Sequence, residues 1–272
     1  MVSDSLRSLY EKLPSDVKLV AVSKFHPVER LMEAYDAGQR IFGENRPQEL
    51  AAKVPQMPSD VEWHFIGHLQ TNKLKLVLPY VSLVQSVDSL HLLEAIDKWG
   101  RENGKVIDVL LELHLGAEET KQGFSEEEIL SMFEKGEGVP PETASASLRP
   151  LPQALSPSSE SQLSSSDPNP AGPSLLCGRG WPQVSGGSSS PFRNVRLRGL
   201  MGMATNTEDE DVIERDFARI EALFRRIRDG HPELADTFTE LSIGMSGDWP
   251  IAVRHGATMV RIGTDIFGPR EY

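Results

Sequence analysis

The sequence predicts an α/β protein folded as a closed (β/α)8 TIM barrel, on three observations. Eight short runs are rich in Val, Ile, Leu and Phe, and segments with apolar residues at helical spacing separate them. Strands that are apolar on both faces and alternate with helices indicate a parallel sheet. Outside one segment of unusual composition 216 residues remain, and eight strand–helix units in that length favour a closed barrel over an open sheet.

The expected elements follow one another along the chain. The strand candidates are Val17–Ser23, Arg40–Gly43, Glu62–Ile66, Leu83–Ser86, Val106–His114, Val195–Met201, Glu240–Ile243 and Thr258–Ile262. The helix candidates are Val28–Ala37, Pro47–Lys53, Asn72–Val77, Ser89–Asn103, Ser125–Phe133, Thr207–Asp229 and Trp249–His255. Two of these helices open with a hydroxyl followed by carboxylates, from Ser125 and from Thr207, a pattern that satisfies the first free amides of a helix.

Residues 136–191 differ in composition from the rest of the chain. Of these 56 residues, 14 are Ser, 10 are Pro and 7 are Gly, so more than half are poor formers of regular structure. Such a segment cannot bury enough apolar surface to offset the entropy lost on ordering it. We therefore predict a single barrel domain over residues 1–272, interrupted by a disordered insertion at 136–191 that acts as a spacer.

Composition and charge exclude several classes of protein. The longest apolar runs fall far short of the roughly 18 residues of a membrane-spanning helix, and the first residues lack a secretory pattern, so we expect a cytoplasmic protein. A net charge of −12 argues against nucleic acid and anionic lipid as partners. The single cysteine, Cys177, allows no intrachain disulfide, and His64, His68 and His114 lack the spacing of paired ligands, so no metal is expected.

Lys24 ends the first expected strand, at the face of a barrel that commonly holds active sites. Burial there lowers the pKa of a lysine and suits its amine to form a Schiff base with a carbonyl. Glycine-rich turns containing Ser246, Gly263 and Thr264 follow the last two expected strands, where barrels often bind phosphate. An imine-forming lysine and a phosphate site together suggest pyridoxal 5′-phosphate (PLP) as cofactor.

Six motifs span most of the chain outside the insertion. They are AVSK at Ala21–Lys24, FGENRPQE at Phe42–Glu49, WHFIGHLQTNK at Trp63–Lys73, RGLMGMAT at Arg198–Thr205, LSIGMSGDW at Leu241–Trp249 and TMVRIGTDIFGPREY at Thr258–Tyr272. In this order they closely resemble the pyridoxal phosphate homeostasis protein family. The resemblance implies a barrel like the N-terminal domain of alanine racemase, with PLP held as an internal aldimine on Lys24.

The resemblance also implies roles for five further residues: Ser246, Gly263 and Thr264 contact the phosphate, Asn45 lines the pocket, and Arg261 faces the pyridine nitrogen. A permanently charged arginine disfavours protonation of that nitrogen, so the ring is a weak electron sink. Racemase relatives take a second acid/base from an additional domain. We expect this chain to lack such a domain, because no residues follow Tyr272. We therefore expect PLP homeostasis without efficient catalysis and with no catalytic residues, in a monomer whose partners are PLP and apo PLP-dependent enzymes.

Two other functions stay open at this stage. The first is a PLP-dependent amino-acid racemase of low activity, which would bind the same cofactor and also convert a substrate. Exchange of the substrate's α-proton distinguishes such an enzyme from a carrier. The second is a Schiff-base aldolase, which would use Lys24 without a cofactor. An absorbance scan distinguishes it from a PLP-binding protein, because only bound PLP gives a yellow band. Glu44 and Asp265 are carboxylates near the expected site, and their spacing does not choose between them as a general base.

Overall fold

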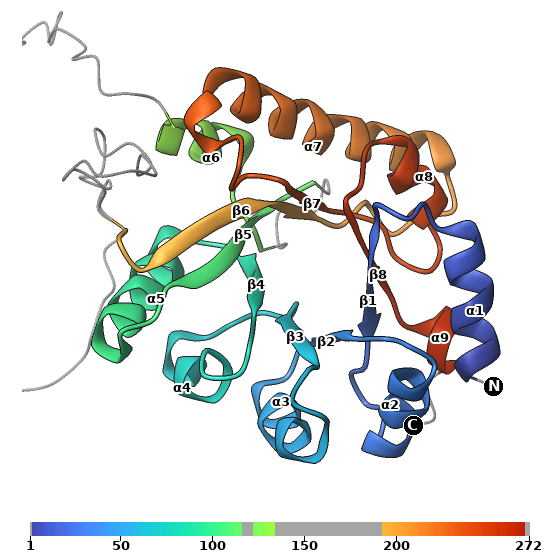
Figure 1. Cartoon of the computed structure of the whole chain (residues 1–272). Helices are drawn as coiled ribbons and strands as arrows, with labels where there is room; N and C mark the ends of the chain where they lie inside the picture. The colour runs from blue at the N-terminus through green and yellow to red at the C-terminus, as the bar shows by residue number, and fades with distance from the viewer. Residues whose placement is uncertain (1, 116–121, 134–191, 270–272) are drawn as a thin grey trace, which may run out of the picture.

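A computed structural model describes residues 2–115, 122–133 and 192–269, and these form a closed barrel of eight parallel strands (Figure 1). The strands are β1 (Lys18–Val22), β2 (Ile41–Glu44), β3 (Glu62–Phe65), β4 (Leu83–Val87), β5 (Ile107–Leu113), β6 (Val195–Gly202), β7 (Glu240–Ser242) and β8 (Met259–Ile262). Each strand pairs with the next, and β8 closes on β1 with Lys18 opposite Met259 and Ala21 opposite Ile262. The predicted barrel is confirmed, and every expected strand bound lies within one residue of the observed one.

Helices lie outside the strands and cover them (Figure 1). They are α1 (Val2–Lys12), α2 (Val28–Asp36), α3 (Pro47–Lys53), α4 (Leu74–Val77), α5 (Leu90–Asn103), α6 (Glu126–Phe133), α7 (Glu210–Gly230), α8 (Trp249–Arg254) and α9 (Thr264–Phe267). Short 3-10 turns are η1 (Val54–Gln56), η2 (Thr71–Lys73) and η3 (Pro232–Leu234). The expected helix Asn72–Val77 is thus split between η2 and α4, while α1 and α9 were not predicted.

Two apolar layers hold the barrel together. The larger layer lies between the strands and the surrounding helices, and α1 joins it through Val2, Leu6 and Leu9. The smaller layer contains Val20, Leu83, Leu110, Met201 and Met259, one from each of five strands. Because successive side chains of a strand point to opposite faces, this second layer fills the inside of the barrel. The barrel is therefore closed at its centre, and ligand sites are restricted to its ends.

The two predicted helix caps have different outcomes. At α6 the capping box forms, because the Ser125 amide donates to Glu128 Oε2 (2.8 Å) and the Glu128 amide donates to Ser125 Oγ (3.1 Å). At α7 the expected cap at Thr207 is wrong. Thr207 Oγ1 accepts the amide of Asp209 and closes a turn before the helix, and Asp209 itself caps α7 by accepting the Asp211 amide (3.0 Å).

The predicted insertion at residues 136–191, with Cys177 in it, lies outside the described residues. Within the described part of the chain, no helix is long and apolar enough to cross a membrane. The same residues contain no group of three or more His, Cys, Asp or Glu side chains placed to hold a metal ion.

Candidate functional site

Five of the six residues predicted to bind the cofactor line one cavity of about 200 Å³. Lys24 follows β1, Ser246 follows β7, Arg261 lies in β8, and Gly263 and Thr264 follow it. Parallel strands place their carboxyl ends at the same end of a barrel, which is why turns far apart in the sequence meet here. We call this cavity the cradle.

Hydrogen-bond donors in the cradle are available to a ligand. The hydroxyls of Ser246 and Thr264 form no hydrogen bond with the described residues, nor do the amides of Ser246 and Gly247 donate one within that part of the chain. The described residues that line the cradle include the cations Lys24 and Arg261 and no carboxylate. Free donors together with positive charge favour an anion, and phosphate is the anion that such amide-and-hydroxyl loops commonly bind.

The loop after β7 is held open toward the cradle by Asp248. Its Oδ1 accepts the amide of Met245 (2.5 Å), and the amides of Asp248 and Trp249 donate to the Met245 carbonyl (3.1 and 2.9 Å). Gly244 enters this loop with φ of +94°, and a Cβ there would lie 2.6 Å from Ala252 Cβ. The loop therefore requires glycine at this position, and its closing bonds leave the next two amides unused.

Gly263 lets the second loop approach the first strand closely. A Cβ at this position would lie 3.3 Å from both Cβ and the carbonyl oxygen of Val22, which also lines the cradle. A side chain larger than a methyl group would therefore crowd Val22 between the β8 loop and β1. The glycine therefore keeps Thr264 and Lys24 on the same small cavity.

A chain of hydrogen bonds across the barrel interior fixes Arg261. Its guanidinium donates to the carbonyl and hydroxyl of Ser242 (2.8 and 2.7 Å) and to the Gly202 carbonyl (2.9 Å). The Ser242 hydroxyl donates to Gln85 Oε1 (2.7 Å), and Gln85 Nε2 donates to His64 Nδ1 (2.9 Å). Burial lowers the pKa of His64 to about 3, so the ring is neutral and can accept this bond.

Arg261 stays charged although it is buried. Burial lowers its pKa to about 10, still well above neutral pH, and the charges of Glu112 and Asp248 oppose the shift. No carboxylate of the described residues lies within 4 Å of its nitrogens, so its charge is not cancelled by an ion pair. Its position on the cradle wall agrees with the predicted role, and its contact with the pyridine nitrogen stays a prediction.

The backbone around Lys24 is held in an unusual conformation. Phe25 has φ of +66°, the one positive value outside glycine among the described residues. This conformation is unfavourable for a bulky side chain, so surrounding contacts must stabilise it. Glu49 Oε2 accepts the Phe25 amide (2.9 Å), and the Arg46 guanidinium lies 4.3 Å from the Phe25 ring centre. Lys24, which is half-buried, therefore sits on a turn that α3 fixes.

A buried ion-pair network fixes the residue before Lys24. Lys53 Nζ donates to the Ser23 carbonyl (2.9 Å), to Glu44 Oε1 (2.6 Å) and to Glu49 Oε2 (3.3 Å). The Ser23 hydroxyl also donates to Glu44 Oε1 (2.7 Å). Burial raises the pKa of Glu44, and Lys53 and Ser23 partly oppose that rise. Sequence reasoning missed this role of Lys53 and Glu49, whose four-residue spacing in α3 resembles an ordinary surface pair.

The carboxylates considered as general bases do not line the cradle. Glu44 is fully buried in the network behind Lys24, and Asp265 is exposed on α9. Asn45, the sixth predicted cofactor residue, does not line it either. Its Oδ1 is buried without a hydrogen-bond partner in the described structure, and a Cβ on Gly67 would overlap its backbone. A contact between Asn45 and the cofactor stays a prediction.

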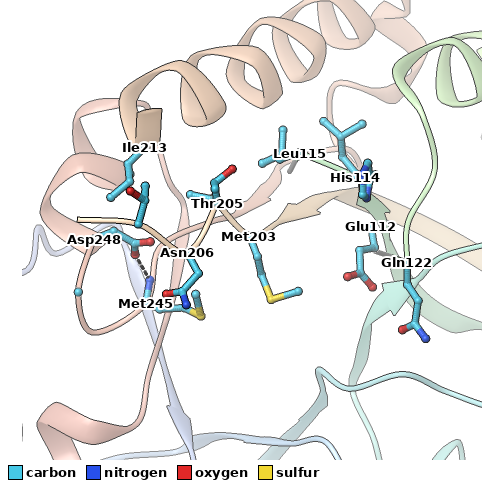
Figure 2. A pocket seen from close by; sticks show the side chains of 14 residues that line it. Glu112, His114, Leu115, Gln122, Met203, Thr205, Asn206, Ile213, Met245 and Asp248 are labelled. Carbon is cyan, nitrogen blue, oxygen red and sulfur yellow. Dashed lines mark hydrogen bonds between the residues drawn. The ribbon is translucent and has the colours of Figure 1, made fainter. Parts of the chain in front are cut away.

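A second, larger cavity of about 550 Å³ adjoins the cradle, and Figure 2 shows the side chains that line it. The segments after β5, β6 and β7 line it, and Met245 and Gly247 belong to both cavities. Glu112, at the end of β5, contributes a carboxylate that is 6% exposed. Burial, followed by the charge of Asp88, raises the pKa of Glu112 to about 7, while Arg261 lowers it. We call this the Glu112 cavity, and sequence reasoning did not single out Glu112.

Comparisons with known proteins agree with the fold. Residues 2–143 match the family model described as alanine racemase, N-terminal domain. The pyridoxal phosphate homeostasis protein of Vibrio alginolyticus is 31% identical over 266 residues, covering 96% of this chain and 90% of that protein. The corresponding protein of Aquifex aeolicus is 33% identical over 260 residues, covering 94% and 88%. PipY of Synechococcus elongatus, solved with PLP bound, is 30% identical with a TM-score of 0.70, covering 98% of this chain and all of that one.

Proposed function

The chain belongs to the pyridoxal phosphate homeostasis protein family, and on that premise we propose that it binds PLP in the cradle and serves in PLP homeostasis. The observation that carries the proposal is the convergence of Lys24 with unused hydroxyls and amides on one small cavity of positive charge. A relative of similar length and fold has been solved with PLP bound, which supports the same ligand here.

The donor set of the cradle fits both ends of PLP. Ser246 and Thr264 offer hydroxyls and the Ser246–Gly247 turn offers amides for the phosphate, and Gly263 leaves room for it beside β1. Lys24 would hold the aldehyde carbon, and Arg261 would donate to the pyridine nitrogen. When bound, PLP supplies an aldehyde that links reversibly to amines.

The protein's own residues set how reactive that site is. The Lys53 network and Glu49 hold the backbone on both sides of Lys24, so the amine is presented from a fixed turn. Arg261 keeps its positive charge because its partners, Ser242 and Gly202, are neutral acceptors. A fixed cation opposite a pyridine nitrogen disfavours protonation of that nitrogen. These features support tight holding of the cofactor over turnover of amino acids.

We therefore propose that the chain is a PLP carrier and not an efficient enzyme. A racemase of low activity is the rival, because the fold is shared with the N-terminal domain of alanine racemase. Exchange of the α-proton of L-alanine in deuterated water separates the two. The carrier predicts exchange far slower than about 1 per second, and faster exchange would establish the enzyme. Apo-enzymes as recipients, the cytoplasmic location and the monomeric state stay predictions.

An absorption spectrum of the purified protein tests the proposal directly. We expect a yellow band that borohydride removes, with the reduced adduct mapped to Lys24 by mass spectrometry. Lys24→Ala should lose the band, whereas Lys75→Ala, which removes an exposed lysine of α4, should keep it. A band that persists in Lys24→Ala, or an adduct on another lysine, would refute the assignment.

A further inference from the structure

The carboxylate of Glu112 opens into the Glu112 cavity without a partner in the described structure. It forms no hydrogen bond and no salt bridge with any described residue, although the residue is 6% exposed. A carboxylate that is nearly enclosed and has no protein partner favours a ligand that donates hydrogen bonds to it or carries positive charge. Figure 2 shows this carboxylate turned from β5 into the Glu112 cavity, toward the side where Met203 lies.

The charged groups nearest to Glu112 do not satisfy it. Arg261 affects its pKa but directs its three hydrogen bonds to Ser242 and Gly202, and no ion pair joins the two side chains. Asp248, the other carboxylate of the described lining, uses one oxygen to accept the Met245 amide within its own loop. Among the described lining residues, Glu112 is therefore the carboxylate with both oxygens left to a ligand.

The remaining lining sets the chemistry of that ligand. The described residues of the Glu112 cavity include no lysine and no arginine, so this part of its lining offers no permanent cation to a carboxylate or phosphate. Met203 and Met245 are 43% and 38% exposed, and with Ile213 and Leu115 they give the cavity adaptable apolar walls. A volume of about 550 Å³ suits a small organic molecule.

We propose that the Glu112 cavity binds a small organic cation, a primary amine without a carboxylate, with its ammonium group on the carboxylate of Glu112. The walls formed by Met203 and Met245 would hold the apolar part. Because Met245 and Gly247 border both cavities, the ligand would lie next to the cradle. An amine is the class of compound that links to an aldehyde, and in this respect the inference rests on the proposed function.

Calorimetric titration with N,N-dimethylbutylamine tests the site. This probe is protonated at neutral pH and carries an N–H group, but a tertiary amine cannot link to an aldehyde, so charge recognition is measured separately from reaction with PLP. We expect the purified protein to bind it and Glu112→Gln to bind it at least about tenfold more weakly, because a charge-assisted hydrogen bond is lost. Glu94→Gln, which removes the same charge from an exposed position on α5, should bind it like the unmodified protein.

Two further measurements locate the probe. Met203→Trp should also weaken binding, because the larger side chain fills the cavity without changing its charge. Pentanoate, an anion of similar length, should not bind. Failure of the unmodified protein to bind the amine, equal affinity of Glu112→Gln, or equal binding of pentanoate would overturn the proposal.

The PLP band of each variant separates this inference from the proposed function. Glu112→Gln should keep the yellow band, because Glu112 does not line the cradle. Amine binding without a yellow band in the unmodified protein would refute PLP binding and leave the cation site standing. A yellow band without amine binding would refute the cation site and leave PLP binding standing.

Discussion

Replacing Lys53 by methionine should destabilise the barrel and loosen the turn that carries Lys24. Lys53 Nζ lies 2.6 Å from Glu44 Oε1, and the two side chains are 9% and 0% exposed. Removing one partner of such a buried pair leaves an uncompensated charge and costs about 3–5 kcal/mol. For a domain of this size, that loss corresponds to a fall in Tm of roughly 10 °C, measurable by thermal and urea unfolding at pH 7.

The pH dependence identifies Glu44 as the source of the loss. Burial already raises the pKa of Glu44, and loss of Lys53 should raise it further. A carboxyl whose pKa is higher in the folded state favours folding when protonated, so its stability falls as pH rises from its unfolded pKa through its folded one. Lys53→Met should therefore regain stability as the pH is lowered from 7 to 5.

Two further variants serve as comparisons for Lys53→Met. Lys53→Met/Glu44→Gln should regain most of the loss at pH 7, because no buried charge remains. Arg225→Met, which breaks a pair whose arginine is 71% exposed, should change stability by less than about 1 kcal/mol. A loss below about 1 kcal/mol in Lys53→Met, or no recovery in the double variant, would refute the reasoning.

Four other variants test the site and its supports. Gly263→Val should weaken PLP binding with little loss of Tm, because its side chain meets β1 at the cradle; unchanged affinity in an absorbance titration would contradict this. Gln85→Leu should lower stability by about 1–3 kcal/mol in urea unfolding, since it leaves buried partners unsatisfied. Glu112→Gln should gain stability over the unmodified protein as pH rises from 5 to 8, because a pKa raised to about 7 makes ionisation of Glu112 oppose folding; parallel curves would argue against it. His255→Gln should lose more stability at pH 6 than at pH 8. Burial lowers the pKa of His255, but hydrogen bonds to carboxylates raise it overall. The charged ring therefore stabilises the fold below the pKa that His255 has in the unfolded chain, and this stabilisation is lost as pH rises through its pKa in the folded protein.

The barrel and most of the cradle follow from the sequence because they depend on local patterns. Strand bounds follow apolar runs, and glycines after β7 and β8 mark loops with little room for a side chain: a Cβ would overlap Ala252 at Gly244 and would be tightly packed against Val22 at Gly263. The helix α1 was missed because it precedes the first strand and has no place in a strand–helix alternation. Its signal was present all the same, in the spacing of Val2, Leu6 and Leu9.

Residues whose role depends on burial could not be predicted in the same way. Lys53 has the sequence environment of a solvated helix lysine, and only the packing of α3 against β1 and β2 turns it into a buried support for Ser23. Glu112 differs, because a carboxylate within the apolar run Val109–Leu115 is a visible anomaly near the end of a strand. A charged residue in such a run indicates either a structural ion pair or a ligand site, and the structure excludes an ion pair with any described residue.

The described linings of the two cavities at this end of the barrel carry opposite charges, and the position of Arg261 explains how both charges can persist side by side. Had Arg261 formed an ion pair with Glu112, the cradle would lose a cation and the larger cavity would lose its carboxylate. The barrel interior prevents this, because Ser242, Gln85 and His64 form a directed chain of neutral groups that holds the guanidinium on the cradle side. The chain ends at a histidine that burial keeps neutral and able to accept. A neutral polar network thus keeps two charges apart, which the proposed phosphate site and the proposed cation site both require.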